Sequence, residues 1–433
     1  MKYPCLSLHS TGEKIKLKGA VFKVKALSGF AFLQLFSHQK MVQCIFEGDF
    51  SQTGIKEGSC LEIEGEIREA SIKDPFIFYS DKEILITTFK ILSSAKAPMP
   101  FDITKKILNI KNDLKLDFRP LSLRHPKERA IFVIQAKLLE ALREFLGQEN
   151  FIEIRSPKIV KEGAEGGANI FEFEYFGKKA YLTQSPQFYK EFCVGVFERV
   201  FEIAPVFRAE KHNTNRHLNE YTSIDLEMGL IDSFYDIMAM ETAALKFVLE
   251  KLQQTCAYEL SLLGVTLVTI GDSIPCLKFW EAKKIVQEYF KLPPDLDEDL
   301  SPLEEQKICE YVQKNLNSDF VFITHFPTNK RPFYAMDCPE NPNETLSFDL
   351  LFRGVEITTG GQRVHDYDQL VEKMKRRGMN PEDFSFFTIA HYHGLPPHGG
   401  LGLGLERLTQ KLLGLENVKE ATLFPRDITR LTP

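Results

Sequence analysis

The sequence predicts an α+β protein in which a small β-barrel precedes a larger region built on an antiparallel sheet flanked by helices. Three observations carry this prediction. Five closely spaced runs of alternating polar and apolar residues fill the first ninety or so positions. A connection rich in Pro and small residues follows at 93–103. Beyond position 104, many strand-like runs occur with few helices between them, and 433 residues suffice for two or three domains.

The N-terminal runs are expected to form strands at residues 14–27, 30–36, 41–47, 60–70 and 82–92. Alternation is clearest in the first run, KIKLKGAVFKVKAL, and the Ser28-Gly29 pair after it is a turn signal. Five short strands joined by Gly-containing turns are typical of an OB-type barrel. A small β-sandwich would give the same pattern, so the pattern alone favours neither.

We therefore divide the chain into a barrel at 1–93, a linker or hinge at 94–118 and a larger domain at 119–433. In the larger domain, helices are expected at 125–149 and 232–253, and residues 401–415 are expected to form a Gly-rich turn that runs into a final helix. Strand-like runs stand at residues 151–157, 178–186, 199–210, 223–230 and 347–364. An acidic, Pro-containing stretch at 292–307 is interpreted as a surface insertion, within about 291–318.

Composition limits the possible function classes. The net charge of −6 argues against a protein that coats nucleic acid through bulk positive charge. The N-terminal sequence lacks a signal-peptide core, and no apolar run approaches the ~20 residues that span a bilayer. Eight scattered cysteines without a C-x-x-C pair are typical of reduced thiols in the cytoplasm rather than of a zinc ribbon.

Three segments carry residues suited to chemistry on a nucleotide. In FRAEKHNTNRHLNEYTSIDLE (207–227), Arg208 could present a rigid donor fork to a phosphate; a charged hairpin with solvated ends is the alternative. In GGLGLGLERL (399–408), glycines allow close approach of a ligand and Arg407 opens a helix, although a tight turn explains the glycines equally well.

The third segment, SFDLLFRGVEITTGGQR, places Asp349 and Glu356 seven residues apart, with Thr359 and Arg363 beyond them. Magnesium prefers carboxylate and phosphate oxygens, so two carboxylates beside arginines fit chemistry on Mg-ATP. Surface ion pairing is the alternative, but a strand this apolar rarely carries so many charges without purpose.

Taken together, these segments resemble the motifs of class II aminoacyl-tRNA synthetases. FLGQENFIEIRSP (145–157) is similar to the first motif, a long helix followed by a strand that ends in proline. FRAE…RHLNEYTSIDLE is similar to the second motif and GLGLGLER to the third, in the same order and spacing. In that family the first motif builds a dimer interface, so the resemblance implies a homodimer.

The resemblance narrows to aspartyl-tRNA synthetases of the short archaeal and eukaryotic type. Three segments carry it: 163–191, TTGGQRVHD (358–366) and the ending LFPRDITRLTP (423–433). It implies an ATP-dependent ligase that activates L-aspartate as aspartyl-adenylate and transfers it to the 3′ end of tRNA(Asp). The match is good from about 117 to 433 and looser in the barrel.

Roles follow from this resemblance. Two cations, Lys190 and Arg363, are expected to bind the side-chain carboxylate of aspartate, because neutral asparagine would leave them under-neutralised. Three further residues are expected to bind the α-ammonium group of aspartate and to orient the substrate: Glu165, Gln187 and Asp225. The expected ATP contacts are Arg208 at the α-phosphate and Tyr221 and Arg407 on the adenine. Four further residues are expected to contact the nucleotide: Glu210, His217, Glu356 and Thr359. The expected magnesium ligands are Asp349, Glu356 and Thr359. Arg208, Arg407 and Glu356 are the expected catalytic residues.

In the barrel, Phe32 and Gln43 match family positions that read the middle anticodon base by stacking and an amide hydrogen bond. The barrel also departs from the family, with Gly19-Ala20 where a Trp is usual and Lys25 where an Arg is usual. Two alternatives follow: an enzyme that also charges tRNA(Asn), or a paralogue that passes aspartyl-adenylate to another acceptor. HYHGLPPH (391–398) is interpreted as a loop over the active site rather than a metal site.

Overall fold

The computed structural model describes Leu8 and residues 10–161, 170–211, 213–293 and 299–433. The chain packs as two compact units, residues 1–130 with 258–264 and residues 131–257 with 265–433. The first unit extends past the barrel, because Ile103 and Leu262 join Phe22 and Phe76 in one buried apolar cluster. The Tyr258 hydroxyl also donates to the Phe76 carbonyl at 2.7 Å.

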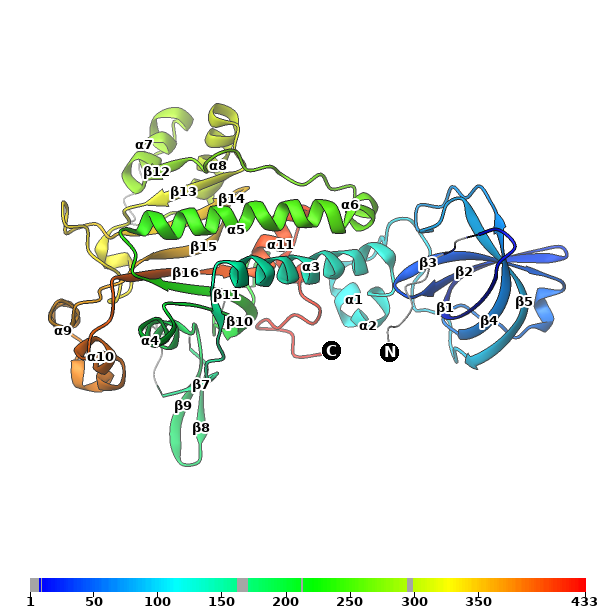
Figure 1. The fold of residues 1–433 in the computed structure, drawn as a ribbon, viewed down its shortest axis with the longest axis horizontal. Coiled ribbons are helices and arrows are strands. Elements are labelled where there is room, and N and C mark those ends of the chain that lie inside the picture. The colour runs from blue at the N-terminus through cyan, green and yellow to red at the C-terminus, as the bar shows by residue number, and fades with distance from the viewer. Residues whose placement is uncertain (1–7, 9, 162–169, 212, 294–298) are drawn as a thin grey trace. The chain divides into compact units, whose positions relative to one another are not determined.

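The N-terminal strands close into a barrel in the order β1-β2-β3-β5-β4 (Figure 1). The strands are β1 (Lys14–Leu27), β2 (Phe30–Ser37), β3 (Lys40–Glu47), β4 (Cys60–Glu69) and β5 (Lys82–Ser93). Alternate side chains point inward, so that Leu33, Leu35, Leu61 and Ile63 are completely buried. The bounds of the five predicted strands are confirmed to within one residue at each end. Because the strands form a closed barrel, the alternative of a β-sandwich is excluded.

The second unit is built on a sheet with eight strands among the described residues, in the order β12-β13-β14-β15-β16-β11-β10-β6. β6 pairs parallel with β10 and β12 with β13, and the other neighbours are antiparallel, as predicted for the larger region. These strands are β6 (Ile152–Glu153), β10 (Arg199–Phe207), β11 (Glu220–Gly229), β12 (Cys276–Lys278), β13 (Phe320–Thr324), β14 (Ser347–Phe352), β15 (Val355–Gln362) and β16 (His398–Gly404).

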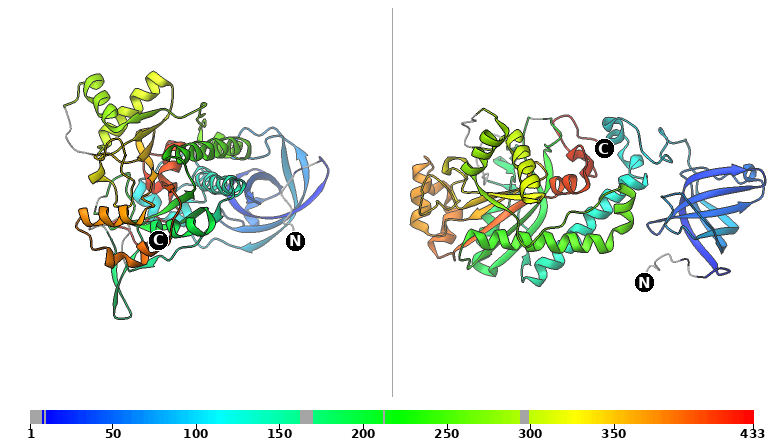
Figure 2. Two further views of the ribbon diagram at one scale, coloured as in Figure 1. Left: turned by 60° about the vertical axis from the view of Figure 1, so that its left-hand side comes forward. Right: turned by 90° about the horizontal axis from the view of Figure 1, so that it is seen from above.

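Helices flank this sheet. The long helix α5 runs along it and contacts β15 and β16, whereas α11 packs on β11 and β15 (Figures 1 and 2). Ser233 caps α5 in a reciprocal capping box with Asp236. The α-helices of the whole described chain are α1 (Asn112–Asp117), α2 (Arg119–Ser122), α3 (Pro126–Gln148), α4 (Gln187–Phe197), α5 (Phe234–Thr255), α6 (Ala257–Leu263), α7 (Phe279–Phe290), α8 (Pro302–Leu316), α9 (Tyr367–Arg376), α10 (Ser385–Tyr392) and α11 (Leu405–Leu413). Of these, α1, α2 and nearly all of α6 belong to the first unit. Among the described residues, none of these helices is long and apolar enough to cross a membrane.

Three predicted strands differ from the structure. Of 151–157 only β6 is a strand, because the Ser156 N–H donates to the Glu202 carboxylate at 2.8 Å instead of to a neighbouring strand, and Pro157 has no N–H to donate. Of 178–186 only β9 (Lys178–Leu182) is a strand, and it joins β7 (Ile159–Val160) and β8 (Glu172–Tyr175) in a separate small sheet. The run 347–364 is a hairpin of β14 and β15, which turns at Arg353 and Gly354 with positive φ angles of 47° and 81°.

The expected acidic surface insertion contains a helix that is part of the core. α8 buries Ile308 and Val312 against α7 and β13. Two of its acidic side chains, Glu304 and Glu305, are also buried; Glu304 pairs with Lys283 at 2.9 Å. The expectation of a surface position is therefore wrong for α8, because its apolar face packs in the core and Glu304 has a buried cationic partner in Lys283.

Candidate active site

A pocket of about 530 Å³ opens over β11, β15 and β16 in the second unit. Its volume is in the range of sites that enclose a small organic ligand. Of the residues singled out from the sequence, this pocket is lined by Gln187, Lys190, Arg208, Glu210, His217, Tyr221, Asp225, Glu356, Thr359, Arg363 and Arg407. Segments up to 220 residues apart in the chain are thus brought together at one site. Glu165 lies outside the described residues.

At one end of the pocket, buried cations and carboxylates alternate. Lys190 Nζ lies 3.0 Å from Asp225 Oδ1, 3.3 Å from Glu227 Oε2 and 2.9 Å from the Leu401 carbonyl oxygen. Arg363 Nε donates to Glu227 Oε1 at 2.9 Å. Glu227 therefore bridges the two expected aspartate-binding cations. Asp225 and Glu227 are two positions apart on β11, so both side chains lie on the same face of the sheet.

The glycines of β16 make this arrangement possible. A Cβ atom on Gly400 would lie 2.2 Å from Glu227 Oε2 and 2.1 Å from the Leu226 carbonyl oxygen. The Gly400 carbonyl also accepts a hydrogen bond from Arg363 Nη2 at 3.0 Å. Burial by itself would lower the pKa of Arg363, but the adjacent Glu227 carboxylate raises it above its ordinary value. Arg363 therefore remains charged, and any side chain at position 400 would break its pairing.

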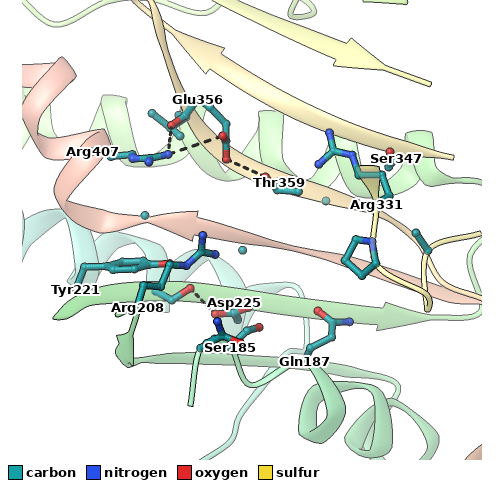
Figure 3. A pocket seen from close by; sticks show the side chains of 18 of the residues that line it. Ser185, Gln187, Arg208, Tyr221, Asp225, Arg331, Ser347, Glu356, Thr359 and Arg407 are labelled. Atoms are coloured by element: carbon teal, nitrogen blue, oxygen red, sulfur yellow. Dashed lines mark hydrogen bonds and ion pairs between the residues drawn. The ribbon is translucent and has the colours of Figure 1, made fainter. Parts of the chain in front are cut away.

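The opposite end of the pocket carries the expected nucleotide-binding residues. The Arg208 guanidinium lies 5.9 Å from the centre of the Tyr221 ring, within reach of a cation–π contact. Glu210 lies 3.4 Å from His217 Nε2 and 3.9 Å from Arg208 Nη1. Figure 3 shows Tyr221 and Arg208 on one wall of the pocket and Arg407 on the other, where Arg407 Nη1 donates to the Glu356 carbonyl at 3.0 Å.

Two carboxylates adjoin the pocket on β14 and β15. Thr359 donates its hydroxyl to Glu356 Oε1 at 2.9 Å, and both side chains line the pocket. Asp349, which pairs with Thr359 in the sheet register, lies behind that lining and accepts from Arg331 Nη2 at 2.8 Å. Burial would raise the pKa of Glu356, but the Arg407 charge and the Thr359 hydrogen bond outweigh it and lower the pKa.

The environment of Asp349 fits a cation site. Burial raises the pKa of Asp349 to about 7; Arg331 opposes this shift and Glu356 adds to it. Its Oδ1 atom is buried and has no hydrogen-bond partner among the described residues. A buried carboxylate oxygen without a partner is costly, and a hard cation would satisfy it. Asp349, Glu356 and Thr359 therefore supply a set of oxygen atoms suited to magnesium.

Several functional candidates were not identified from the sequence. Glu227 and Arg331 pair with predicted residues, and the Ser223 hydroxyl donates to Asp225 Oδ2 at 2.5 Å. Glu305 of α8 accepts from Arg216 Nη2 at 2.5 Å and from the Glu356 backbone N–H at 3.1 Å. For Glu227 a signal existed, namely two carboxylates at period-two spacing in one strand. Arg331 and Glu305 lie in segments without a recognisable motif.

The segment 391–398, which was expected to form a loop over the active site, begins in a helix and ends in a strand. His391 belongs to α10 and His398 begins β16, and both imidazoles are completely buried. Glu191 of α4 lies between them. Burial would raise the pKa of Glu191, but its hydrogen bond with His398 outweighs burial and lowers it.

In the first unit, Phe32 and Gln43 lie on neighbouring strands of the barrel. Phe32 is half-buried and makes an edge-to-face contact with Phe30, with ring centres 5.4 Å apart. Gln43 Nε2 donates to Glu83 Oε2 at 2.8 Å. Lys25 stands directly opposite Phe32 in the register of β1 and β2, which puts an aromatic ring and a cation side by side. Their role in reading an anticodon stays a prediction.

Comparisons with known proteins agree on one family. The model of the family "tRNA synthetases class II (D, K and N)" matches residues 111–428. A relative from Deinococcus radiodurans, named aspartate–tRNA(Asp/Asn) ligase, is 43% identical over 98% of this chain and 96% of its own length. An aspartate–tRNA(Asp) ligase from Pyrococcus horikoshii is 37% identical over 98% and 97%. The crystal structure of P. horikoshii asparaginyl-tRNA synthetase with asparaginyl-adenylate superposes with a TM-score of 0.89 at 29% identity, covering 98% and 97% of the two chains.

Proposed function

Since this chain belongs to the class II tRNA synthetases, we propose that it ligates L-aspartate to tRNA with ATP. Relatives at 37–43% identity over nearly the whole chain carry the name aspartate–tRNA ligase. Structural neighbours include asparaginyl enzymes, so the amino acid must be argued from the pocket.

The charges of the pocket balance with aspartate and not with asparagine, and this observation carries the proposal. Lys190 and Arg363 are matched by Asp225 and Glu227 before any ligand binds. A bound amino acid adds its ammonium, which can pair with Asp225, its α-carboxylate, which faces the ATP end of the pocket in the proposed reaction, and its side chain. Once the ammonium pairs with Asp225, only Glu227 is left to balance Lys190 and Arg363. The aspartate side chain supplies the second negative charge at this end of the pocket, whereas the neutral asparagine amide leaves one buried positive charge unmatched. Uncompensated buried charge is costly, so the pocket favours aspartate.

The first chemical step needs no general base, because the α-carboxylate of aspartate is already ionised. One of its oxygens attacks the α-phosphorus of ATP, the bond from that phosphorus to the bridging oxygen breaks, and pyrophosphate leaves. Arg208 would neutralise the developing charge on the α-phosphate, while Gln187 and Asp225 hold the amino acid in line. In the second step a hydroxyl of the terminal tRNA ribose attacks the carbonyl carbon, and AMP leaves.

The walls of the nucleotide end suit an adenine base. The Tyr221 ring and the Arg407 guanidinium lie on opposite sides of the pocket, which supports a role in sandwiching the base (Figure 3). Glu210 and His217 would contact the rest of the nucleotide. Asp349, Glu356 and Thr359 would hold magnesium, which when bound supplies charge neutralisation on the phosphates.

The RNA partner we propose is tRNA(Asp), read by the outer face of β2 and β3 near Phe32 and Gln43. A second candidate partner, tRNA(Asn), is favoured by the D. radiodurans and Thermus thermophilus relatives, both named for tRNA(Asp/Asn) and both 43% identical. We further propose a homodimer in the cytoplasm. The position of β6 at the edge of the large sheet, with half-exposed Ile152, supports a subunit contact there.

Charging assays with labelled aspartate test this proposal and separate the two RNA candidates. Purified tRNA(Asp) and tRNA(Asn) are offered separately to the full chain with ATP and magnesium. Charging of tRNA(Asp) alone supports a discriminating ligase, and charging of both supports the wider partner set. If neither tRNA accepts aspartate while aspartate-dependent pyrophosphate exchange proceeds, the ligase proposal fails and the adenylate has another acceptor.

A further inference from the structure

Behind the aspartate end of the pocket lies a compact group of three buried side chains from three different elements. Glu191 comes from α4, His391 from α10 and His398 from the start of β16. One ligand atom of each lies within 4.8 Å of the other two. His398 Nε2 is 3.3 Å from Glu191 Oε2, and His391 Nε2 is 3.8 Å from the same oxygen. None of the three lines the pocket, so the proposed reaction does not use them.

The two imidazoles are oriented as metal ligands are. His398 Nδ1 lies 2.9 Å from the Pro396 carbonyl oxygen, and His391 Nδ1 lies 3.4 Å from the Phe387 carbonyl oxygen. A carbonyl only accepts, so both contacts place a hydrogen on Nδ1. In the metal-free protein Nε2 of His398 donates to Glu191 Oε2, and a bound cation would take the place of that proton. Backbone carbonyls that fix a histidine tautomer in this way are typical of the surroundings of a bound metal.

One atom of the group lacks a partner. His391 Nε2 is buried and has no hydrogen bond within the described part of the chain. Buried polar side-chain atoms are seldom left in this state, and each case asks for an explanation. A cation placed between Nε2 and the Glu191 carboxylate would satisfy both atoms at once.

From this geometry we infer that Glu191, His391 and His398 bind one divalent transition-metal ion of the zinc class. Ligand atoms about 2.0–2.1 Å from a tetrahedral ion stand about 3.3–3.4 Å apart, and the two nitrogen-to-oxygen separations of 3.3 and 3.8 Å are close to that spacing. Two imidazoles and one carboxylate favour zinc or cobalt over magnesium, so this site is chemically distinct from the one at Glu356. A water molecule would complete the tetrahedron, because the second Glu191 oxygen accepts from Gln187.

Such an ion would act on the amino-acid pocket through Gln187. Its amide nitrogen donates to Glu191 Oε1 at 2.6 Å, and its amide oxygen accepts from Arg363 Nη2 at 3.5 Å. The ion would tie α4, which carries Lys190, to α10 and β16. This consequence rests on the proposed function, whereas the metal site itself does not.

Metal binding by the full chain tests the inference without reference to activity. The purified protein is treated with a chelator, titrated with Co²⁺ and followed by visible absorption, and its zinc content after reloading is measured by mass spectrometry. We expect about one equivalent of Co²⁺ with the intense bands of a tetrahedral site, displaced by Zn²⁺ but not by excess Mg²⁺. Wild-type protein that binds neither ion would overturn the inference.

Variants then locate the site. His398→Gln and His391→Ala should weaken Co²⁺ binding by roughly tenfold or more, as the loss of a ligand requires. His393→Ala removes an exposed histidine of the same segment and should bind as the wild type does. If a histidine variant does not fold, Glu191→Gln of equal size replaces it. Tetrahedral bands that persist in a folded variant would place the ion elsewhere and refute this assignment.

Discussion

Replacing Lys190 with Met tests the aspartate end of the pocket, because this change removes a charge and keeps most of the side-chain volume. The Lys190 ammonium group is buried between Asp225 and Glu227 at 3.0 and 3.3 Å. Glu227 would retain Arg363, but Asp225 would lose its cation. Breaking one partner of a buried ion pair typically costs about 3–5 kcal/mol. We expect a loss of this size in the free energy of unfolding, measured by urea denaturation.

The same change should also remove the cation that meets the substrate carboxylate. Truncating one partner of a buried, hydrogen-bonded charge pair costs about 2–5 kcal/mol. Since 1.4 kcal/mol is about a factor of ten, kcat/KM for aspartate in pyrophosphate exchange should fall roughly thirtyfold to several thousandfold. Lys284→Met is the matched control, because Lys284 is an exposed lysine on α7. A folded Lys190→Met protein with unchanged kcat/KM would refute the proposed role and leave Lys190 a structural residue.

Further predictions concern other parts of the chain. Burial raises the pKa of Glu241 to about 8, with the Thr358 hydrogen bond opposing and Asp349 adding to the shift. At pH values between the ordinary pKa of a Glu side chain and about 8, Glu241 therefore holds a proton in the folded state that it loses in the unfolded state. The free energy of unfolding should fall as the pH rises through this range, by at most about 1.4 kcal/mol per pH unit. Glu241→Gln should flatten this part of the stability–pH curve, and an unchanged slope would contradict the shift. Asp349→Asn should raise the Mg²⁺ concentration for half-maximal exchange by roughly tenfold; an unaltered magnesium dependence would exclude Asp349 as a ligand. Phe32→Ala should lower kcat/KM for tRNA by roughly 5- to 150-fold, as the loss of one stacked base implies, and leave pyrophosphate exchange intact. Sedimentation at micromolar concentration should give a dimer, and a monomer would contradict the subunit contact proposed at β6.

The barrel could be predicted from the sequence because one physical rule governs every strand in it. Each strand has one face in the core, so apolar residues recur at every second position, as at Leu61, Ile63 and Ile67. The same rule fails where both faces are covered. β14 is buried throughout, so its end could not be told from the start of β15. The turn at Arg353-Gly354 lacks the Asn-Gly or Asp-Gly pair that usually marks a hairpin.

The site was predictable as far as motifs reach. Residues such as Arg208 and Arg407 stand in recognisable segments and line one pocket. The motifs do not contain the residues that form hydrogen bonds and ion pairs with the site residues. From the sequence, Glu305 is expected to lie on an acidic surface, whereas in the structure it forms an ion pair with Arg216. The buried metal-ligand geometry of His391 and His398 was likewise hidden, because Glu191, the third member, lies 200 residues earlier in the chain.

The central claim is that the buried charges of this pocket select aspartate. Its most direct test is ATP–pyrophosphate exchange by the purified chain with aspartate and with asparagine as the only amino acid, in parallel. The charge balance around Lys190, Arg363, Asp225 and Glu227 predicts exchange with aspartate and essentially none with asparagine at equal concentration. Exchange that is equal with both amino acids, or faster with asparagine, would contradict it.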